Sequence, residues 1–166
     1  MDEKIIWSIG FVLVVILLCV LKPNAGRIFL GFFYLIMAVG VNVINAFTNP
    51  QSTVKMGTES LIPIYRTFFS DIVSIAPSLF ILIVALFQIS IALMILNKHI
   101  KVKFGLLAAT IFLILITPFG LIQVPWLGIA AIQIYLFQKD FDRTFFEMVF
   151  RRSGEKTTAQ CSHINS

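Results

Sequence analysis

Four carboxamide side chains stand inside long stretches that carry no charged residue. Asn42 and Asn45 are three residues apart and share one face of a helix, and Gln88 and Gln133 lie in two later stretches. Within a membrane such side chains cost free energy unless they find hydrogen-bonding partners. Two interpretations stay open. The amides bond across helix interfaces, or they line a polar pocket that holds a quinone, a lipid or a small metabolite.

Three charged residues stand at the borders of these stretches. Arg66 and Asp71 come just before the third stretch, where they could contact the head group of a lipid or quinone, or simply remain solvated loop charges. Arg27 stands just before the second stretch, and we expect its side chain to extend to the membrane surface. No Asp, Glu, Lys or Arg lies within a stretch, which argues against an ion-driven transporter.

The sequence offers little for catalysis. It has none of the motifs typical of serine hydrolases, zinc proteases, P-loop proteins or dinucleotide-binding proteins. The two histidines, His99 and His163, lie outside the uncharged stretches, so haem would lack its usual ligand. Cys19 and Cys161 form no metal-binding or redox motif. We therefore expect no cofactor and no metal, and the sequence does not identify an enzyme.

The uncharged stretches themselves predict membrane-spanning helices. They cover Ile5–Leu21, Ile28–Val54, Ile72–Asn97 and Phe104–Gln138. Apolar runs of about 18 residues or more are typical of such helices. Hydrophobic residues make up 58% of the chain and the mean hydropathy is +0.95, well above an ordinary globular domain. The fold class is therefore all-α, a polytopic transmembrane helical bundle.

Turn residues divide these stretches into predicted spans. The last stretch would be about 52 Å long as one helix, far beyond a membrane core of roughly 30 Å. Pro118 and Pro125 interrupt it, so two antiparallel segments fit better, as two crossings or as a short buried hairpin. Residues 1–25 would form an N-terminal helix and a basic turn, and residues 26–138 a membrane core. The predicted core spans are 28–47, 72–96, 104–119 and 125–138.

The segments between and after the spans are amphipathic or polar. Residues 60–69 are aromatic and amphipathic, which predicts a surface helix or a cap over the bundle. Residues 139–152 predict an amphipathic helix on the membrane surface, with its basic end near anionic lipid. Residues 153–166 predict a disordered tail.

The basic residues predict the orientation. The net charge of +5 is typical of a membrane protein whose Lys and Arg flank the helices on the cytoplasmic side, rather than of a nucleic-acid-binding protein. With five segments and the N-terminus outside, most Lys and Arg residues fall on the inner side. We therefore expect a multi-pass protein of the cell membrane with a cytoplasmic C-terminus.

From Gly26 onward the layout resembles the DoxX-like family of small integral membrane proteins. The resemblance rests on Gly26–Ala38, on the helix around Leu86–Leu93 and on the ending Lys139–Asp142. It implies a four-helix core, with Ile5–Leu21 as an extra N-terminal helix, and a role beside redox enzymes. Gln88 stands where the family often has Glu, and Asn42 and Asn45 replace an expected lysine.

These observations favour a small integral membrane protein that acts as an accessory or anchor subunit of a redox or envelope complex. Its partners would be membrane lipids, a protein of that complex and a quinone, with no nucleic acid. The alternative is a carrier of a lipid, quinone or small molecule with a polar pocket inside the membrane. A third hypothesis is an enzyme acting on a lipid or quinone, with Arg66 and Asp71 near the head group.

Overall fold

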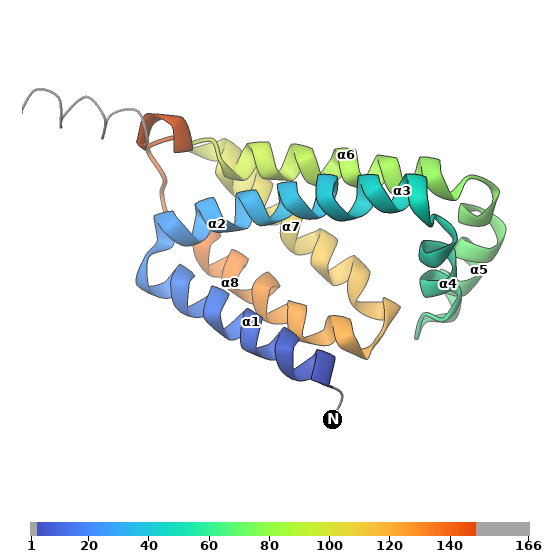
Figure 1. Cartoon of the computed structure of the whole chain (residues 1–166). Coiled ribbons are helices and arrows are strands. Elements are labelled where there is room, and N and C mark those ends of the chain that lie inside the picture. Colours follow the sequence, from blue (N-terminus) through green and yellow to red (C-terminus); the bar gives the residue numbers. More distant parts are fainter. Residues whose placement is uncertain (1–2, 149–166) are drawn as a thin grey trace, which may run out of the picture.

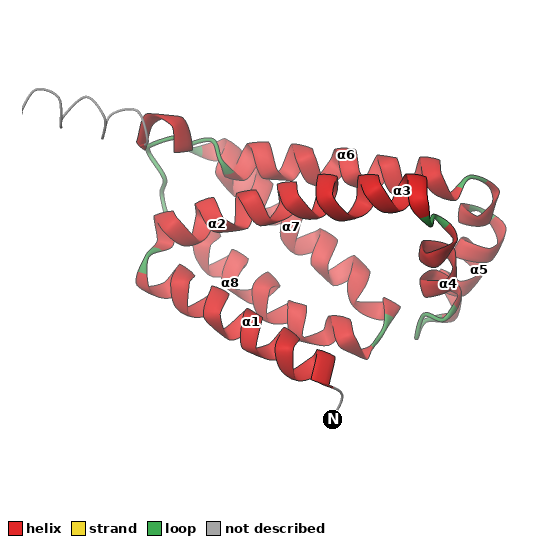
Figure 2. Ribbon diagram, in the orientation of Figure 1, coloured by secondary structure: helices red, strands yellow, loops and turns green. Residues whose placement is uncertain are grey.

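The structure, a computed structural model, describes residues 3–148, and every regular element in that range is a helix (Figures 1 and 2). The elements are α1 (Glu3–Leu21), α2 (Pro23–Ile36), the π-helix η1 (Met37–Val43), α3 (Ile44–Thr48), α4 (Gln51–Thr58), α5 (Pro63–Asp71), the 3₁₀ segment η2 (Val73–Ile75), α6 (Pro77–Ile95), α7 (Ile100–Ile116), the 3₁₀ segments η3 (Thr117–Phe119) and η4 (Leu121–Trp126), and α8 (Leu127–Phe137). The predicted helical fold class is thus confirmed.

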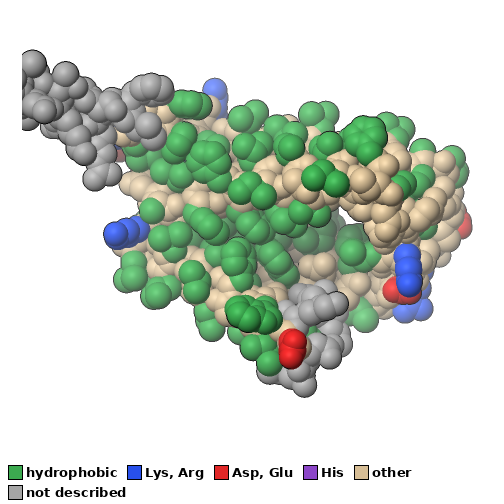
Figure 3. All heavy atoms as spheres, viewed as in Figure 1, with side chains coloured by type: hydrophobic (Ala, Val, Ile, Leu, Met, Phe, Trp, Pro, Cys, Tyr) green, Lys and Arg blue, Asp and Glu red, His purple; other side chains and the backbone are tan. Residues whose placement is uncertain are grey.

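Three continuous helices in the described part are long and apolar enough to cross a membrane. They cover Pro23–Thr48, Pro77–Ile95 and Ile100–Phe119, while Ile5–Leu21 and Gln123–Phe137 are apolar but shorter. Large hydrophobic side chains are exposed along these helices, and the charged side chains in view lie toward their ends (Figure 3). Such a surface suits lipid rather than water. The chain is therefore a membrane protein.

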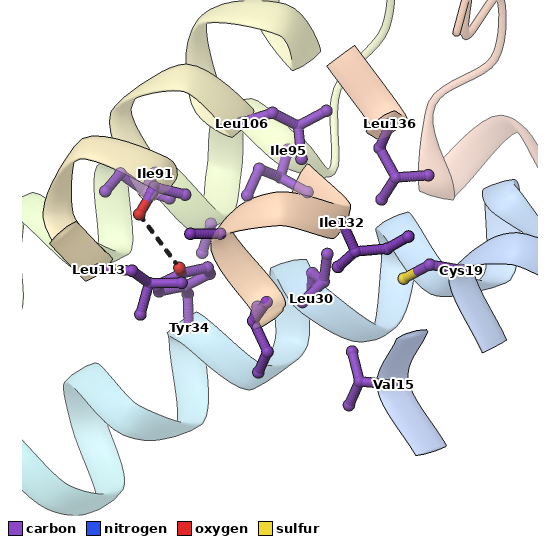
Figure 4. Close-up of a cluster of buried hydrophobic side chains, with 14 of the residues drawn as sticks. Val15, Cys19, Leu30, Tyr34, Ile91, Ile95, Leu106, Leu113, Ile132 and Leu136 are labelled. Carbon is purple, nitrogen blue, oxygen red and sulfur yellow. Dashed lines mark hydrogen bonds between the residues drawn. The ribbon is translucent and has the colours of Figure 1, made fainter. Parts of the chain in front are cut away.

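Five helices, rather than the predicted four, share the core. α1 packs on α2 and α8, α2 on α6, α6 on α7, and α7 on α8, which closes a ring (Figure 1). α1 supplies the buried side chains Val15 and Cys19, which pack with Leu30 of α2 and Leu136 of α8 (Figure 4). The N-terminal helix is therefore part of the core and not an addition to it.

The second span begins earlier than predicted. α1 ends at Leu21 and α2 begins at Pro23, so Lys22 alone makes the turn, whereas the second span was predicted to begin at residue 28. Proline suits the first turn of a helix because it has no N–H to leave unpaired and its φ is already helical. α2 then continues through η1 and α3, so Arg27 lies one turn inside the helix.

The predicted interruption of the last stretch is confirmed. α7 ends in the η3 segment at Phe119, Gly120 is extended, and η4 leads into α8. α8 then packs alongside α7. The prolines in η3 and η4 explain the interruption, because a proline inside an α-helix removes a hydrogen bond and clashes with the preceding turn.

α4 and α5 form a cap at one end of the bundle (Figure 1). The ring of Phe69, from α5, lies against Phe80 at 5.4 Å and Phe119 at 5.3 Å between centroids. Ser60 donates a hydrogen bond to the carbonyl of Pro118 at 2.8 Å, which ties the cap to η3. Of the two arrangements predicted for residues 60–69, a surface helix or a cap over the bundle, the structure has the cap, with helix α5 starting at Pro63.

The helix predicted for residues 139–152 is wrong for its first part. Residues 139–144 are not helical, and a helical turn begins only at Phe145. This irregular segment places Phe141 in the core, and the Phe141 carbonyl accepts a hydrogen bond from the His99 N–H at 2.8 Å. These tertiary contacts replace those of a surface helix. We call residues 139–148 the C-terminal strap. Residues 149–152 and the predicted tail, 153–166, lie outside the described residues.

Candidate functional site

Two of the four predicted amides meet. Asn42, in the π-helix η1, donates a hydrogen bond from Nδ2 to Oε1 of Gln88 on α6 at 2.6 Å. Gln88 is buried. Among the described residues this is the one hydrogen bond of the Gln88 carboxamide, so its NH₂ group keeps donor capacity. π-helical segments often occur at functional sites.

The other two amides lie in separate places. Asn45 contacts the start of α4, because its Nδ2 donates to Thr53 Oγ1 at 3.0 Å and its Oδ1 accepts from Ser52 Oγ at 3.1 Å. Gln133, on α8, is fully buried in the core. The predicted pocket of four amides is therefore not assembled by these contacts.

A buried polar network joins three core helices around Gln133. Its Nε2 donates to the hydroxyl of Tyr34 at 2.9 Å, and its Oε1 accepts from Thr110 Oγ1 at 3.2 Å. Tyr34 in turn donates to the carbonyl of Ala109 at 3.4 Å, and its ring lies among the apolar core side chains (Figure 4). These hydrogen bonds fix the orientation of α2, α7 and α8 about their own axes relative to one another.

Arg66 and Asp71 are both on α5 and exposed, but they do not pair with each other among the described residues. Arg66 donates from Nε to the carbonyl of Ser60 at 2.6 Å, and Asp71 accepts from Ser70 Oγ at 2.6 Å. Arg66 therefore holds the cap together, and Asp71 remains open to a head group or to solvent.

Arg27 lies in a different environment from the one that its sequence context predicted. Its side chain is fully buried rather than extended to the membrane surface. Nη1 donates to the carbonyl of Asn97 at 2.7 Å and Nη2 to the carbonyl of Arg143 at 2.9 Å. The guanidinium also lies 4.7 Å from the centroid of the Phe141 ring, a cation–π contact. The available signal was Pro23, which places the helix start one turn before Arg27.

The C-terminal strap crosses the end of the bundle opposite the α4–α5 cap. Glu147 pairs with Lys98 at 2.6 Å and Asp140 with Lys103 at 2.9 Å, and the Phe145 N–H donates to the Leu96 carbonyl at 3.1 Å. Thr144 and Glu147 also bond reciprocally, because each side chain accepts the other residue's backbone N–H. This is a capping box, which starts the helical turn at Phe145.

A surface hollow of about 430 Å³ opens between the start of α7 and the strap. We call it the end hollow. It is lined by His99, Ile100, Lys103, Asp140, Phe141 and Asp142. His99 has φ 54° and ψ −133°, a left-handed conformation that favours glycine. A backbone strained in this way costs free energy and is typical of functional sites.

The ion pairs of the strap depend on ionised carboxylates. The hydrogen bond from Lys98, with that from the Thr144 N–H, lowers the pKa of Glu147. The hydrogen bond from Lys103 likewise lowers the pKa of Asp140. A carboxyl group whose pKa is lower in the folded state stabilises that state above its ordinary pKa, and the stabilisation is lost as the pH falls through the lowered value.

We therefore expect the strap to loosen in acid. Hydrogen–deuterium exchange of the amides in residues 139–148, corrected for the intrinsic effect of pH, should rise as the pH falls below the ordinary carboxyl range. In Glu147→Gln the same amides should already exchange faster at neutral pH and respond less to acid. Strap protection that is equal at neutral and acid pH in the wild-type protein would contradict this expectation.

Comparison with known proteins adds no relative: no protein-family model, characterised protein or solved structure matches the chain.

Proposed function

We propose that the chain is an accessory or anchor subunit of a redox or envelope complex, the role that its resemblance to the DoxX-like family implies. The observation that supports an anchor is the hydrogen bonding of the buried polar residues. The five buried polar residues of the described part each have at least one hydrogen-bonding partner within the chain, and the buried side-chain atoms left without one are Ser8 Oγ and Arg27 Nε. The five residues are Arg27, Ser60, Gln88, Thr110 and Gln133. Such bonding stabilises helix packing, and it leaves the outer surface and the two ends for recognition.

The two ends differ in charge, which supports an orientation. The end crossed by the strap carries Lys22, Lys98, Lys101, Lys103, Lys139 and Arg143, which stand in or next to the turns at that end of the helices. The positive-inside rule places such an end in the cytoplasm. In this proposal α1 and α8 also cross the membrane, so that the chain has five segments, an outer N-terminus and a cytoplasmic C-terminus. The basic end would then meet the partner protein.

A specific observation favours the alternative, a carrier of a lipid, quinone or small molecule. Asn42 belongs to the π-helix η1, and its pairing with Gln88 leaves part of both carboxamides without a partner among the described residues. A carbonyl-bearing ligand such as a quinone could accept a hydrogen bond from the free donor of Gln88. This reading needs the ligand to reach Gln88 between α6 and η1.

One experiment separates the two proposals. The tagged full-length protein is extracted in lipid nanodiscs and everything that copurifies is identified by mass spectrometry. We expect a stoichiometric protein partner that is lost when the basic end is reversed by Lys22→Glu with Lys101→Glu, both exposed. Lys55→Glu, at the opposite end, is the matched control and should keep the partner.

The other outcomes are equally informative. A quinone or lipid that copurifies without a protein partner, and is lost in Gln88→Leu, would favour the carrier over the subunit. A partner that is retained equally by the basic-end variant and by the control would count against docking at this end.

A further inference from the structure

We propose that the end hollow binds the head group of a zwitterionic phospholipid of the phosphoethanolamine class. The hollow is an open depression on the surface, formed by two elements far apart in sequence: the first turn of α7 and the strap. Its volume, about 430 Å³, is in the range of small-molecule sites. Its place at the end of a spanning helix is where phospholipid head groups lie.

The charges of the end hollow suit a ligand that carries both signs. Lys103 and the imidazole of His99 are the groups that can receive a phosphate, and Asp140 and Asp142 are the groups that can receive an ammonium. Among the residues that line the hollow, two carboxylates stand against one lysine, within an end of the bundle that is basic as a whole. A phosphate of either head group is attracted by the basic residues, but only a zwitterion also carries an ammonium that can pair with the carboxylates of Asp140 and Asp142.

The ion pairs at the end hollow leave Lys103, His99 and Asp142 with the capacity to bind a ligand. Lys103 uses one donor for Asp140 at 2.9 Å, and an ammonium has three. Asp142 approaches His99 only at 3.8 Å, and both side chains are largely exposed. A phosphate between Lys103 and His99 and an ammonium beside Asp142 would thus add contacts without breaking the pair that holds the strap.

An apolar stripe beside the hollow favours a lipid over a free phosphoethanolamine. Ile100, Phe104, Leu107 and Ile111 follow one another at helical spacing along α7, and all four are exposed. Ile100 also lines the end hollow. A lipid whose head group occupies the hollow can therefore lay its acyl chains along α7.

The backbone of His99, beside the hollow, has a positive φ. The peptide accepts φ 54° at a non-glycine residue, at a cost of about 1–3 kcal/mol. Glycine would adopt this backbone freely. A histidine at this position therefore costs conformational free energy that a glycine would not. His99 lines the end hollow and its side chain is largely exposed, so that it can contact a phosphate.

The test places the full-length protein in nanodiscs of phosphatidylethanolamine and phosphatidylglycerol with identical acyl chains at equal mole fractions. The lipid retained after transfer to detergent is then quantified by mass spectrometry. We expect phosphatidylethanolamine to be enriched roughly three- to tenfold over phosphatidylglycerol, the size of one or two exposed charge-assisted contacts. Soluble phosphoethanolamine should not displace it, because the free head group lacks the acyl chains.

Three variants assign that preference to the end hollow. Asp142→Asn and Lys103→Gln should abolish the enrichment, and His99→Gly should reduce it while the thermal stability stays equal or rises, because glycine relieves the backbone. Lys55→Gln, at the opposite end, is the matched control and should keep the enrichment. Equal retention of both lipids by the wild-type protein would overturn the proposal, as would an enrichment that survives in Asp142→Asn, or displacement by soluble phosphoethanolamine.

Discussion

Arg27→Ala is expected to release the C-terminal strap and to lower the free energy of unfolding by roughly 2–5 kcal/mol. The guanidinium bridges two backbone carbonyls, those of Asn97 in the α6–α7 turn and Arg143 in the strap. Without the guanidinium both carbonyls lose a charged hydrogen-bond donor, and the Phe141 ring loses its cation–π contact. The substitution also leaves a cavity in a fully buried site.

Two further substitutions separate these contributions. Arg27→Met keeps most of the volume but supplies no donor, so its loss should be smaller than that of Arg27→Ala and should still include strap release. Arg27→Lys keeps the charge but has no planar fork that reaches two carbonyls at once. We therefore expect Lys to restore only part of the stability.

The measurements are thermal unfolding of the purified protein and hydrogen exchange of the strap amides. Lys22→Ala, in the exposed turn just before α2, is the matched control and should change neither. If Arg27→Ala unfolds at the wild-type temperature and its strap amides remain protected, Arg27 does not hold the strap. Because this result concerns stability alone, it is independent of which lipid or protein binds the basic end.

The helices were predictable from the sequence because lipid imposes one dominant requirement. A backbone in a membrane must satisfy its own hydrogen bonds, so an uncharged apolar run is a helix. Pro118 and Pro125 then divide the last run, as they do in the structure. The start of α2 was less predictable, because Lys22 and Arg27 both look like loop residues in the sequence. Only the packing shows that Lys22 faces solvent and that Arg27 is buried.

The pairing of the polar residues was not predictable, because it depends on how the helices rotate and shift against one another. Asn42 and Asn45 share a face, yet one bonds to α6 and the other to α4. The π-helix that carries Asn42 changes the local rotation, and periodicity gives no sign of it. Tyr34, which joins Gln133 to α7, was indistinguishable in the sequence from an ordinary core aromatic.

The C-terminal strap is a second feature that the sequence pattern did not predict. The sequence of residues 139–152 has helical periodicity, and Phe141 looked like part of its apolar face. In the structure Phe141 is buried against Arg27, a residue far away in the chain. A local pattern cannot anticipate a contact between segments this distant, and here the distant contact determines the backbone.

Gly26→Ala is the second change expected to have a large effect, because α1 and α2 touch at that glycine. A Cβ atom at Gly26 would lie 2.6 Å from both Cα and Sγ of Cys19. A real Cβ does not approach backbone so closely, so the two helices would have to separate. We expect a loss of roughly 1–3 kcal/mol, even though alanine is the better helix former.

Gly10→Ala is the matched control within α1, since a Cβ at Gly10 would meet nothing within 4 Å. There the higher helix propensity of alanine should leave the melting temperature unchanged or raise it. Adding Cys19→Ala to Gly26→Ala removes the sulfur but not the Cα, so only part of the loss should return. A Gly26→Ala protein as stable as Gly10→Ala would mean that α1 does not pack against α2 at this point, and the five-helix core would have to be abandoned.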